Sequence, residues 1–457
     1  MTERILNRKN LISFGLFAVA FHAVITFFPY FFDHLDWMFI ADYILLGLTG
    51  FAAVWYIAKE QYPIRFQPAQ MLLILFLAWY IISCLSMTIT FGSDWVTYNS
   101  EGLLNTAVSG LLVFPLGYVM VREGKNSFGR TLLHIVLLGW TLFIAYVLFY
   151  IFQGQTITTF NYGLIQIKDK ALQLNCNQNT TGAWEMLFFL VCCFMTLWCK
   201  KTPLKIVYGL ASVIHFVGLT LSNCRAGFLA SLAGVMAIAG IAVYLWLDRK
   251  KSPHKLLVAL IAAVAAGAAY YFLSQAVFSI YNGLIKGAKS SNRAFAEQEQ
   301  TFSGREQVWG YAVEGIFSSF RTAVFGVTPM SVVEMINQVS TGEKGVYTHN
   351  QFLEIAAGIG IPGLCIFLGW FGLIVRDAYK LFFVQKDRTL FLIVPVIIMA
   401  LMLANMMEAT LEFYDFINHY AFFLLCGLLY GKVNEPIRVK TLSRQEIRNK
   451  ERKKKKK

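Results

Sequence analysis

The chain contains a succession of apolar blocks of about 20 residues, separated by shorter polar segments. A helix needs about this length of apolar sequence to cross the hydrocarbon core of a bilayer. Because 57% of the 457 residues are hydrophobic and only 14% are charged, the chain is predicted to be an integral membrane protein. Twelve spans are expected, near residues 11–32, 38–58, 70–91, 103–121, 131–152, 183–199, 204–221, 226–247, 256–285, 352–375, 389–405 and 417–431.

The expected fold is all-α, with about 12 transmembrane helices in one polytopic membrane domain over residues 1–431. Residues 432–457 are expected to be a basic cytoplasmic tail. One connection, residues 286–350, is far longer than an ordinary loop, and loops of this size commonly serve a function. It is predicted to be a partly helical extracytoplasmic loop before the tenth span.

The positions of Lys and Arg orient these spans. The first block lacks a cleavage-site pattern and is expected to remain as an anchor, so that both termini lie on one side. On that side fall 31 of the 40 Lys and Arg residues, which predicts that both termini are cytoplasmic. The tail ends in RNKERKKKKK, and a basic run beside a membrane is typical of an orientation and anionic-lipid signal. Membrane lipids rather than nucleic acid are therefore the expected partners of the tail.

An amphipathic stretch in the long loop, SGREQVWGYAVEGIFSSF, is predicted to be a helix. Ser303 and Glu306 have the spacing of a capping box, and apolar residues recur at helical spacing from Trp309 to Phe320. Arg305 falls in the first turn, on the same face as Trp309. A guanidinium and free backbone N–H groups at this place would form an anion site. The alternative is an arginine that extends to lipid phosphate or to solvent.

Two polar segments lie at other outer ends of spans. In LTLSNCRAGFLASLAG, Arg225 begins a helix after a very short outer turn, and small residues beside it allow close helix packing. It is either an anion ligand or an ordinary interfacial arginine. In LNCNQNTTGAW, Asn179 begins a glycosylation sequon, although an Asn-rich turn that caps a helix explains the same residues.

His349, in KGVYTHNQFLEIAAGIG, is placed where the long loop meets an apolar span. Asn350 is adjacent and Glu354 follows after more than one helical turn. An imidazole titrates near neutral pH, so at the mouth of a span it could accept a proton from a polar substrate. The other histidines lack comparable polar neighbours in the sequence and are interpreted as structural: His22, His34, His134, His215, His254 and His419.

Twelve spans also suggest a transporter or a flippase. Transporters place ionisable residues near the bilayer midplane and often repeat their halves. Here the interiors of the spans contain almost no charge, and the notable cations gather at the outer surface. This distribution fits chemistry on a lipid-linked anion and leaves a flippase as the alternative.

These segments together resemble the O-antigen ligase and O-antigen polymerase superfamily of bacterial membrane glycosyltransferases. The resemblance is found in SNCRA, GREQVW, FGVTP, THNQFLEIAAGIGIPG and NQNTTG, over about residues 174–369. In two places the chain departs from the family pattern: Cys224 replaces a common Ser, and FGVTP lacks an expected second glycine.

The resemblance implies an inverting transfer of a glycan from undecaprenyl diphosphate to an acceptor hydroxyl, without nucleotide sugar, metal or other cofactor. His349 would be the general base, and Arg225 and Arg305 would bind the diphosphate. Supporting roles are expected for Asn350, Trp309, Asn179 and Glu354.

The resemblance also places the protein in the bacterial cytoplasmic (inner) membrane, with its active site extracytoplasmic. Its expected partners are the undecaprenyl-diphosphate-linked donor, a glycan or lipid-linked acceptor, and other polysaccharide-assembly proteins. A ligase, a polymerase and a protein O-glycosyltransferase all remain open.

Overall fold

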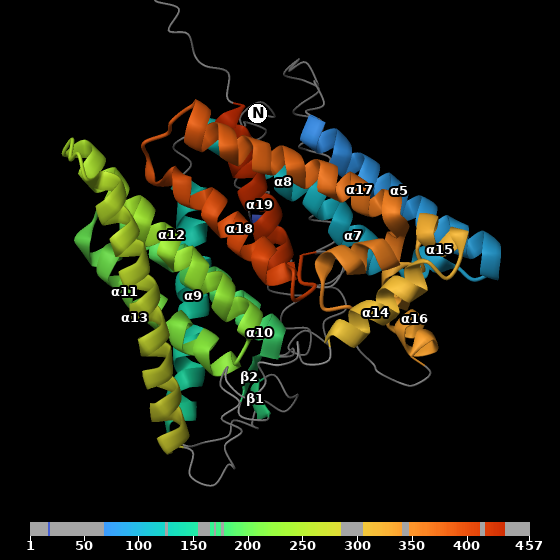
Figure 1. Ribbon diagram of the computed structural model, residues 1–457, viewed down its shortest axis with the longest axis horizontal. Helices are drawn as coiled ribbons and strands as arrows, with labels where there is room; N and C mark the ends of the chain where they lie inside the picture. The colour runs from blue at the N-terminus through green and yellow to red at the C-terminus, as the bar shows by residue number, and fades with distance from the viewer. Residues whose placement is uncertain are drawn as a thin grey trace, which may run out of the picture.

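The computed structural model is a bundle of long helices (Figure 1). It describes residues 17–18, 68–123, 127–153, 165–168, 171–174, 178–284, 305–340, 347–411 and 416–434. The longer helices are α5 (Pro68–Phe91), α7 (Ser100–Val108), α8 (Phe114–Glu123), α9 (Ser127–Phe152), α10 (Gln178–Trp198), α11 (Thr202–Ser222), α12 (Arg225–Arg249), α13 (Lys255–Leu284), α14 (Arg305–Ile316), α16 (Val332–Val339), α17 (Gln351–Tyr379), α18 (Ile393–Asn405) and α19 (Phe416–Val433). Shorter elements are α6 (Trp95–Tyr98), α15 (Phe320–Phe325), the π-helical turns η1 (Ser109–Val113) and η3 (Lys380–Val384), and the 3-10 turns η2 (Pro329–Ser331) and η4 (Leu390–Leu392).

Seven of the described helical segments are long and apolar enough to cross a membrane. They are Pro68–Phe91, Leu133–Phe152, Gln178–Trp198, Thr202–Ser222, Arg225–Arg249, Lys255–Tyr281 and Gln351–Val384. Large apolar side chains such as Leu75, Leu210 and Leu260 point out of the bundle, as expected where lipid covers a helix. The predominantly helical membrane protein predicted from the sequence is therefore confirmed.

The predicted number of twelve spans is tested only in part. The blocks near 11–32 and 38–58 lie outside the described residues except for positions 17–18. Three further blocks coincide with helices that are interrupted or short: the run α7–η1–α8, α18 and α19. These fall outside the seven segments, so twelve remains a prediction.

A two-stranded hairpin departs from the all-α expectation. Strands β1 (Ile165–Lys168) and β2 (Ala171–Leu174) pair antiparallel, with Ile165 opposite Leu174. Large apolar residues recur at every second position, Ile165 and Ile167 in β1 and Leu172 and Leu174 in β2, which is the period of a strand with one buried face. Leu172 is buried there beside α10 and α11. The hairpin thus covers the end of the bundle at which α10 begins.

The helices form two groups that are joined by α18 and α19 (Figure 1). One group contains α9 to α13, and the other contains α5, α7, α8 and α17. Helix α18 packs against α10 and α12, whereas α19 packs against α8 and α17. Trp370 of α17 is fully buried among aromatic rings that include Phe114, Phe367 and Phe423, and apolar packing of this kind holds α17 against α19.

Helix α17 is broken at Ile359 and Gly360, and the FGVTP segment occupies the break. The N–H groups of Val327 and Thr328 donate to the carbonyls of Ala357 and Gly358, at 2.9 and 2.8 Å. Gly360 has φ +78°, and a Cβ added there would lie 2.0 Å from the Val324 carbonyl oxygen. The close approach of the two backbones therefore explains why residue 360 is a glycine.

The long loop is partly helical in residues 305–340, where α14, α15 and α16 lie beside the first half of α17. Ile316 and Ile336 pack there against Ala356 and Ala357. The helix predicted from Arg305 is α14, which ends at Ile316; the prediction that the same helix continues to Phe320 is wrong, because Phe320 begins α15. The proposed cap at Ser303 lies outside the described residues.

Candidate functional site

His349 lies in the turn immediately before α17. Its backbone is left-handed, with φ +50°, and Asn350 caps the helix by accepting from the N–H groups of Phe352 and Leu353 at 3.0 and 3.2 Å. This cap fixes the chain direction at His349. The imidazole is 23% exposed, so it is held by the protein and still reachable.

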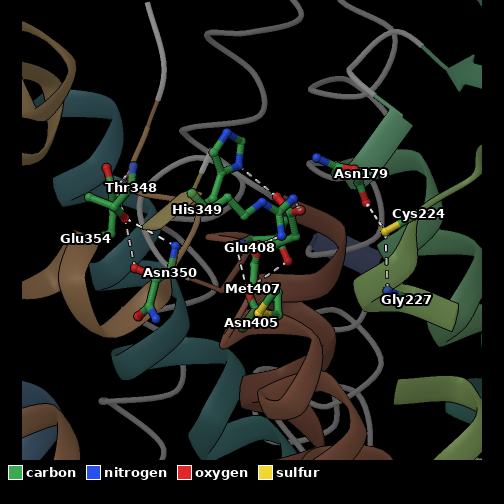
Figure 2. Close-up of polar contacts among 12 residues, drawn as sticks. Asn179, Cys224, Gly227, Thr348, His349, Asn350, Glu354, Asn405, Met407 and Glu408 are labelled. Carbon is green, nitrogen blue, oxygen red and sulfur yellow. Dashed lines mark hydrogen bonds and ion pairs between the residues drawn. The ribbon is translucent and has the colours of Figure 1, made fainter. Parts of the chain in front are cut away.

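Glu408 lies beside the imidazole. Its Oε2 is 3.1 Å from Nδ1 of His349, and the other ring nitrogen points away from Glu408 (Figure 2). A carboxylate next to Nδ1 favours the tautomer in which Nδ1 is protonated and Nε2 has a free lone pair. The pair therefore presents Nε2 as a proton acceptor.

Arg305, at the first position of α14, shares the same carboxylate. Its Nη2 donates to Oε1 of Glu408, and its Nη1 donates to the Met407 carbonyl at 2.6 Å. The side chain of Glu408 is 5% exposed and that of Arg305 is 17% exposed, so the guanidinium compensates a nearly buried negative charge. The arginine and the histidine are connected through one carboxylate.

The segment that contains Glu408 follows α18 and is tied to the start of α17. Asn350 Nδ2 donates to the Met406 carbonyl at 3.1 Å, and the N–H of Leu411 donates to Oε1 of Gln351 at 2.9 Å. These contacts hold Glu408 in register with His349.

Trp309 and Glu354 support the same turn from either side. The indole N–H of Trp309 donates to the Thr348 carbonyl at 2.9 Å. Glu354 is fully buried, and its Oε2 accepts from the N–H and the hydroxyl of Thr348 at 3.1 and 2.7 Å. Both side chains position residue 348, next to His349.

Arg225 and Asn179 lie at the N-terminal ends of α12 and α10. Cys224 caps α12: its Sγ accepts from the N–H of Gly227 at 3.3 Å and donates to the Asn179 carbonyl at 3.4 Å (Figure 2). Cys224, which stands where the resemblance gives a common Ser, is therefore the N-cap of α12. Arg225 is half-buried at the first helical position, and the contact of Asn179 with this turn is made by its backbone.

The electrostatics of Cys224 connect this turn to the histidine cluster. Burial and, to a smaller extent, the charge of Glu408 raise the pKa of the Cys224 thiol to about 12, and Arg305 opposes the rise. The N-terminus of α12 is therefore within electrostatic range of Glu408, which agrees with the packing of α12 on α18. The structure joins His349, Arg305, Trp309, Asn350 and Glu354 through hydrogen bonds to shared neighbours, and Arg225 begins α12, which packs on α18.

Glu408 was missed by sequence reasoning. The only signal was an acidic outer loop without Lys or Arg, residues 406–416, and nothing in its spacing singled out one acid. Across the described part of the chain, no cluster of three or more His, Cys, Asp or Glu side chains is arranged to hold a metal ion.

A comparison with known protein families finds a match over the segment that contains most of these residues. Residues 210–368 match a family model described as O-antigen ligase. This match includes Arg225, Arg305 and His349, and ends before Glu408. No curated protein matches the chain.

Proposed function

We propose that this chain, which the match of residues 210–368 assigns to the O-antigen ligase superfamily, transfers a glycan from undecaprenyl diphosphate to an acceptor hydroxyl. Membership indicates membrane glycosyltransferase activity of the O-antigen ligase type. The observation that supports the finer proposal is the His349–Glu408–Arg305 cluster, because it combines a proton acceptor with a cation at the end of a membrane helix.

The proposed reaction is a single displacement. The acceptor oxygen attacks the anomeric carbon and gives up its proton to Nε2 of His349, while the bond from that carbon to the diphosphate oxygen breaks. The bonding electrons leave with the diphosphate, and attack from the opposite face inverts the anomeric centre. Glu408 is a positioning residue: it keeps Nδ1 protonated and stabilises the imidazolium that forms.

The arginines are proposed to stabilise the diphosphate as its charge develops. Arg305 uses two of its five N–H donors on Glu408 and Met407, which leaves donors for an incoming anion. Arg225 begins α12, where the helix dipole and free backbone N–H groups also favour an anion. In this proposal the two guanidinium groups neutralise the charge that divalent cations neutralise in many phosphate sites.

The proposed location is the bacterial cytoplasmic membrane, with both termini cytoplasmic and the site extracytoplasmic. The 31-to-9 division of Lys and Arg supports this orientation. Lys344→Cys and Gln298→Cys should react with an impermeant thiol reagent in intact cells or protoplasts. Protection until lysis would reverse the orientation.

The decisive test uses the purified protein in detergent with a lipid-linked donor and an acceptor. New glycosidic linkage that persists in EDTA is expected, because the arginines take the place of a metal. Loss in EDTA with recovery in Mg²⁺ or Mn²⁺ would contradict that role. A well-folded protein that forms no linkage with matched substrates, yet moves lipid-linked glycan across liposomes, would favour the flippase alternative.

The acceptor is to be identified in cells. A strain that lacks the protein should accumulate long carrier-linked chains if a ligase is missing, or single repeat units if a polymerase is missing. Changes confined to glycosylated proteins would instead identify a protein acceptor.

A further inference from the structure

Arg321 lies on α15, beside the end of the membrane helix α5. Its Nη2 contacts the sulfur of Met87, and its guanidinium lies over the Phe91 ring, 5.3 Å from the ring centroid. Its Nε is buried and has no hydrogen-bond partner among the described residues. Burial lowers the pKa of this guanidinium from its usual value, although an arginine stays charged at neutral pH.

Three other arginines of the described chain, Arg305, Arg376 and Arg388, have carboxylate partners. Arg305 pairs with Glu408, and Arg376 pairs with the adjacent Asp377. No described carboxylate lies within ion-pair distance of Arg321. A half-buried cation without a counterion among the described residues would be stabilised by an anion from outside them.

The surface around Arg321 is apolar and exposed. Phe320 is 84% exposed beside it, and Phe317 is exposed at the end of α14. On α5, Leu85 and Ile89 form an exposed stripe that leads to the same end, with Ile89 at 86% exposure. Helix α15 packs against α5, so the Phe residues extend the lipid-facing surface of a membrane helix. Exposed aromatic side chains beside a cation are typical of a membrane–water interface.

We propose that Arg321 binds the phosphate of an anionic membrane phospholipid, while Phe317 and Phe320 insert among the neighbouring acyl chains. Charge complementarity selects this occupant, because the surface offers one unpaired guanidinium inside an aromatic patch. Such a lipid would anchor the turn between α14 and α15, residues 317–319, to the bilayer.

The proposed site differs from the His349 cluster. Arg305 begins α14 and Arg321 follows its end, and a helix of 12 residues is about 18 Å long. The inference rests on α5 being a membrane helix and is independent of the proposed transfer reaction. A lipid at this turn would fix the far end of the helix whose first residue holds Glu408.

The binding test uses native mass spectrometry of the full-length protein in detergent with added phosphatidylglycerol. Arg321→Gln should weaken the retention of one lipid about 10-fold or more, and Arg321→Lys should weaken it less. Arg388→Gln is the matched control, because Arg388 already pairs with Asp248. Inorganic phosphate in millimolar excess should not displace the lipid. Equal retention by wild type and Arg321→Gln, or displacement by free phosphate, would overturn the proposal.

A second measurement tests insertion in phosphatidylglycerol nanodiscs. A nitroxide at Phe320→Cys should be more accessible to oxygen than to a nickel chelate, whereas one at Glu306→Cys, exposed at the other end of α14, should show the reverse. Size-exclusion chromatography checks the fold of both variants. Nickel accessibility at Phe320→Cys equal to that at Glu306→Cys would exclude insertion.

Discussion

Two pairs of a histidine and a glutamate occupy different regions of the molecule. In the loop cluster, Nδ1 of His349 lies 3.1 Å from Glu408, and in the bundle of α9–α11, Nδ1 of His215 lies 2.8 Å from Glu185. The side chains of the first pair are 23% and 5% exposed, and those of the second pair are fully buried. Both contacts join Nδ1 of a histidine to a glutamate oxygen, so the difference in the roles proposed for the two histidines must come from what surrounds the contacts.

Every polar atom of the buried pair is used. The Thr141 hydroxyl donates to the Leu137 carbonyl at 2.6 Å and also lies within hydrogen-bond distance of Nε2 of His215, at 3.0 Å. Trp140 donates to the second oxygen of Glu185 at 3.0 Å. Both ring nitrogens of His215 therefore have protein partners, and the network joins three helices. At His349, in contrast, Nε2 points away from Glu408 (Figure 2). An available second nitrogen therefore separates a candidate base from a structural histidine.

His349→Ala tests this distinction with the largest expected effect. Loss of proton transfer should lower the single-turnover rate about 10²- to 10⁴-fold. Donor affinity should stay nearly unchanged, because the ring need not contact the diphosphate. His215→Ala is the matched control and should leave the rate of the folded enzyme near wild type. A near-normal rate in His349→Ala would make both histidines structural.

Glu185→Ala tests whether the buried His215–Glu185 pair stabilises the bundle. It leaves His215 and Trp140 without their buried partner, and removing one member of a buried pair costs about 3 to 5 kcal/mol. Thermal unfolding in detergent should show a large loss of stability, whereas Glu408→Ala at the more exposed pair should show a smaller one. An unchanged melting temperature would mean that the network does not hold the three helices together.

These pairs also show what sequence could predict. Apolar block length identified the membrane helices, and neighbouring residues singled out His349 with Asn350. His215 was assigned a structural role because it lacked polar neighbours in the sequence, and that reason is wrong, since Glu185 reaches it from 30 positions away. Glu408 was not predicted for the same reason, because it lies 59 positions from His349 in the sequence. Local spacing gives helices and caps, but contacts between helices depend on the packing of the bundle.

Glu408→Gln tests the positioning role. The amide keeps the shape of the carboxylate but can donate to Nδ1, which would place the ring proton on Nε2 and remove the lone pair needed by the base. We expect a fall in turnover of about 10²-fold with donor affinity less affected, and partial recovery in Glu408→Asp. If turnover is unaffected, the carboxylate does not set the histidine tautomer.

Arg305 and Arg225 should behave differently from His349. Arg305→Ala and Arg225→Ala should weaken both donor binding and turnover by about 10- to 100-fold, because hydrogen bonds to charged groups are lost. Lys should restore each only in part, since an ammonium lacks the planar fork. Arg305→Ala also leaves Glu408 without its counterion, which destabilises the site. The double variant Arg305→Ala/Glu408→Gln removes both charges, so a loss of donor binding that persists in it is due to the missing guanidinium and not to the unpaired carboxylate. The same binding defect in His349→Ala would make the histidine another diphosphate ligand.

Substitution of Thr328 gives the smallest expected effect on stability. Thr328 supports α17, the helix that follows His349, and so belongs to the region of the His349–Glu408 pair. It has φ +69°, which is strained for a β-branched residue, and its buried hydroxyl has no hydrogen-bond partner among the described residues. A second glycine, expected in FGVTP from the resemblance, would relieve both costs at this position. Removing the backbone strain gains about 1 to 3 kcal/mol, and the greater entropy of glycine in the unfolded chain offsets part of this gain. Thr328→Gly should therefore stabilise the protein by about 1 kcal/mol.

Thr328→Ala is the control, because it removes the hydroxyl and keeps the strained backbone, and it should stabilise less. Turnover should not change in either variant, since the N–H of residue 328 still donates to the Gly358 carbonyl and supports α17. A loss of turnover in Thr328→Gly, with the fold intact, would show that the strain at this position helps to place His349.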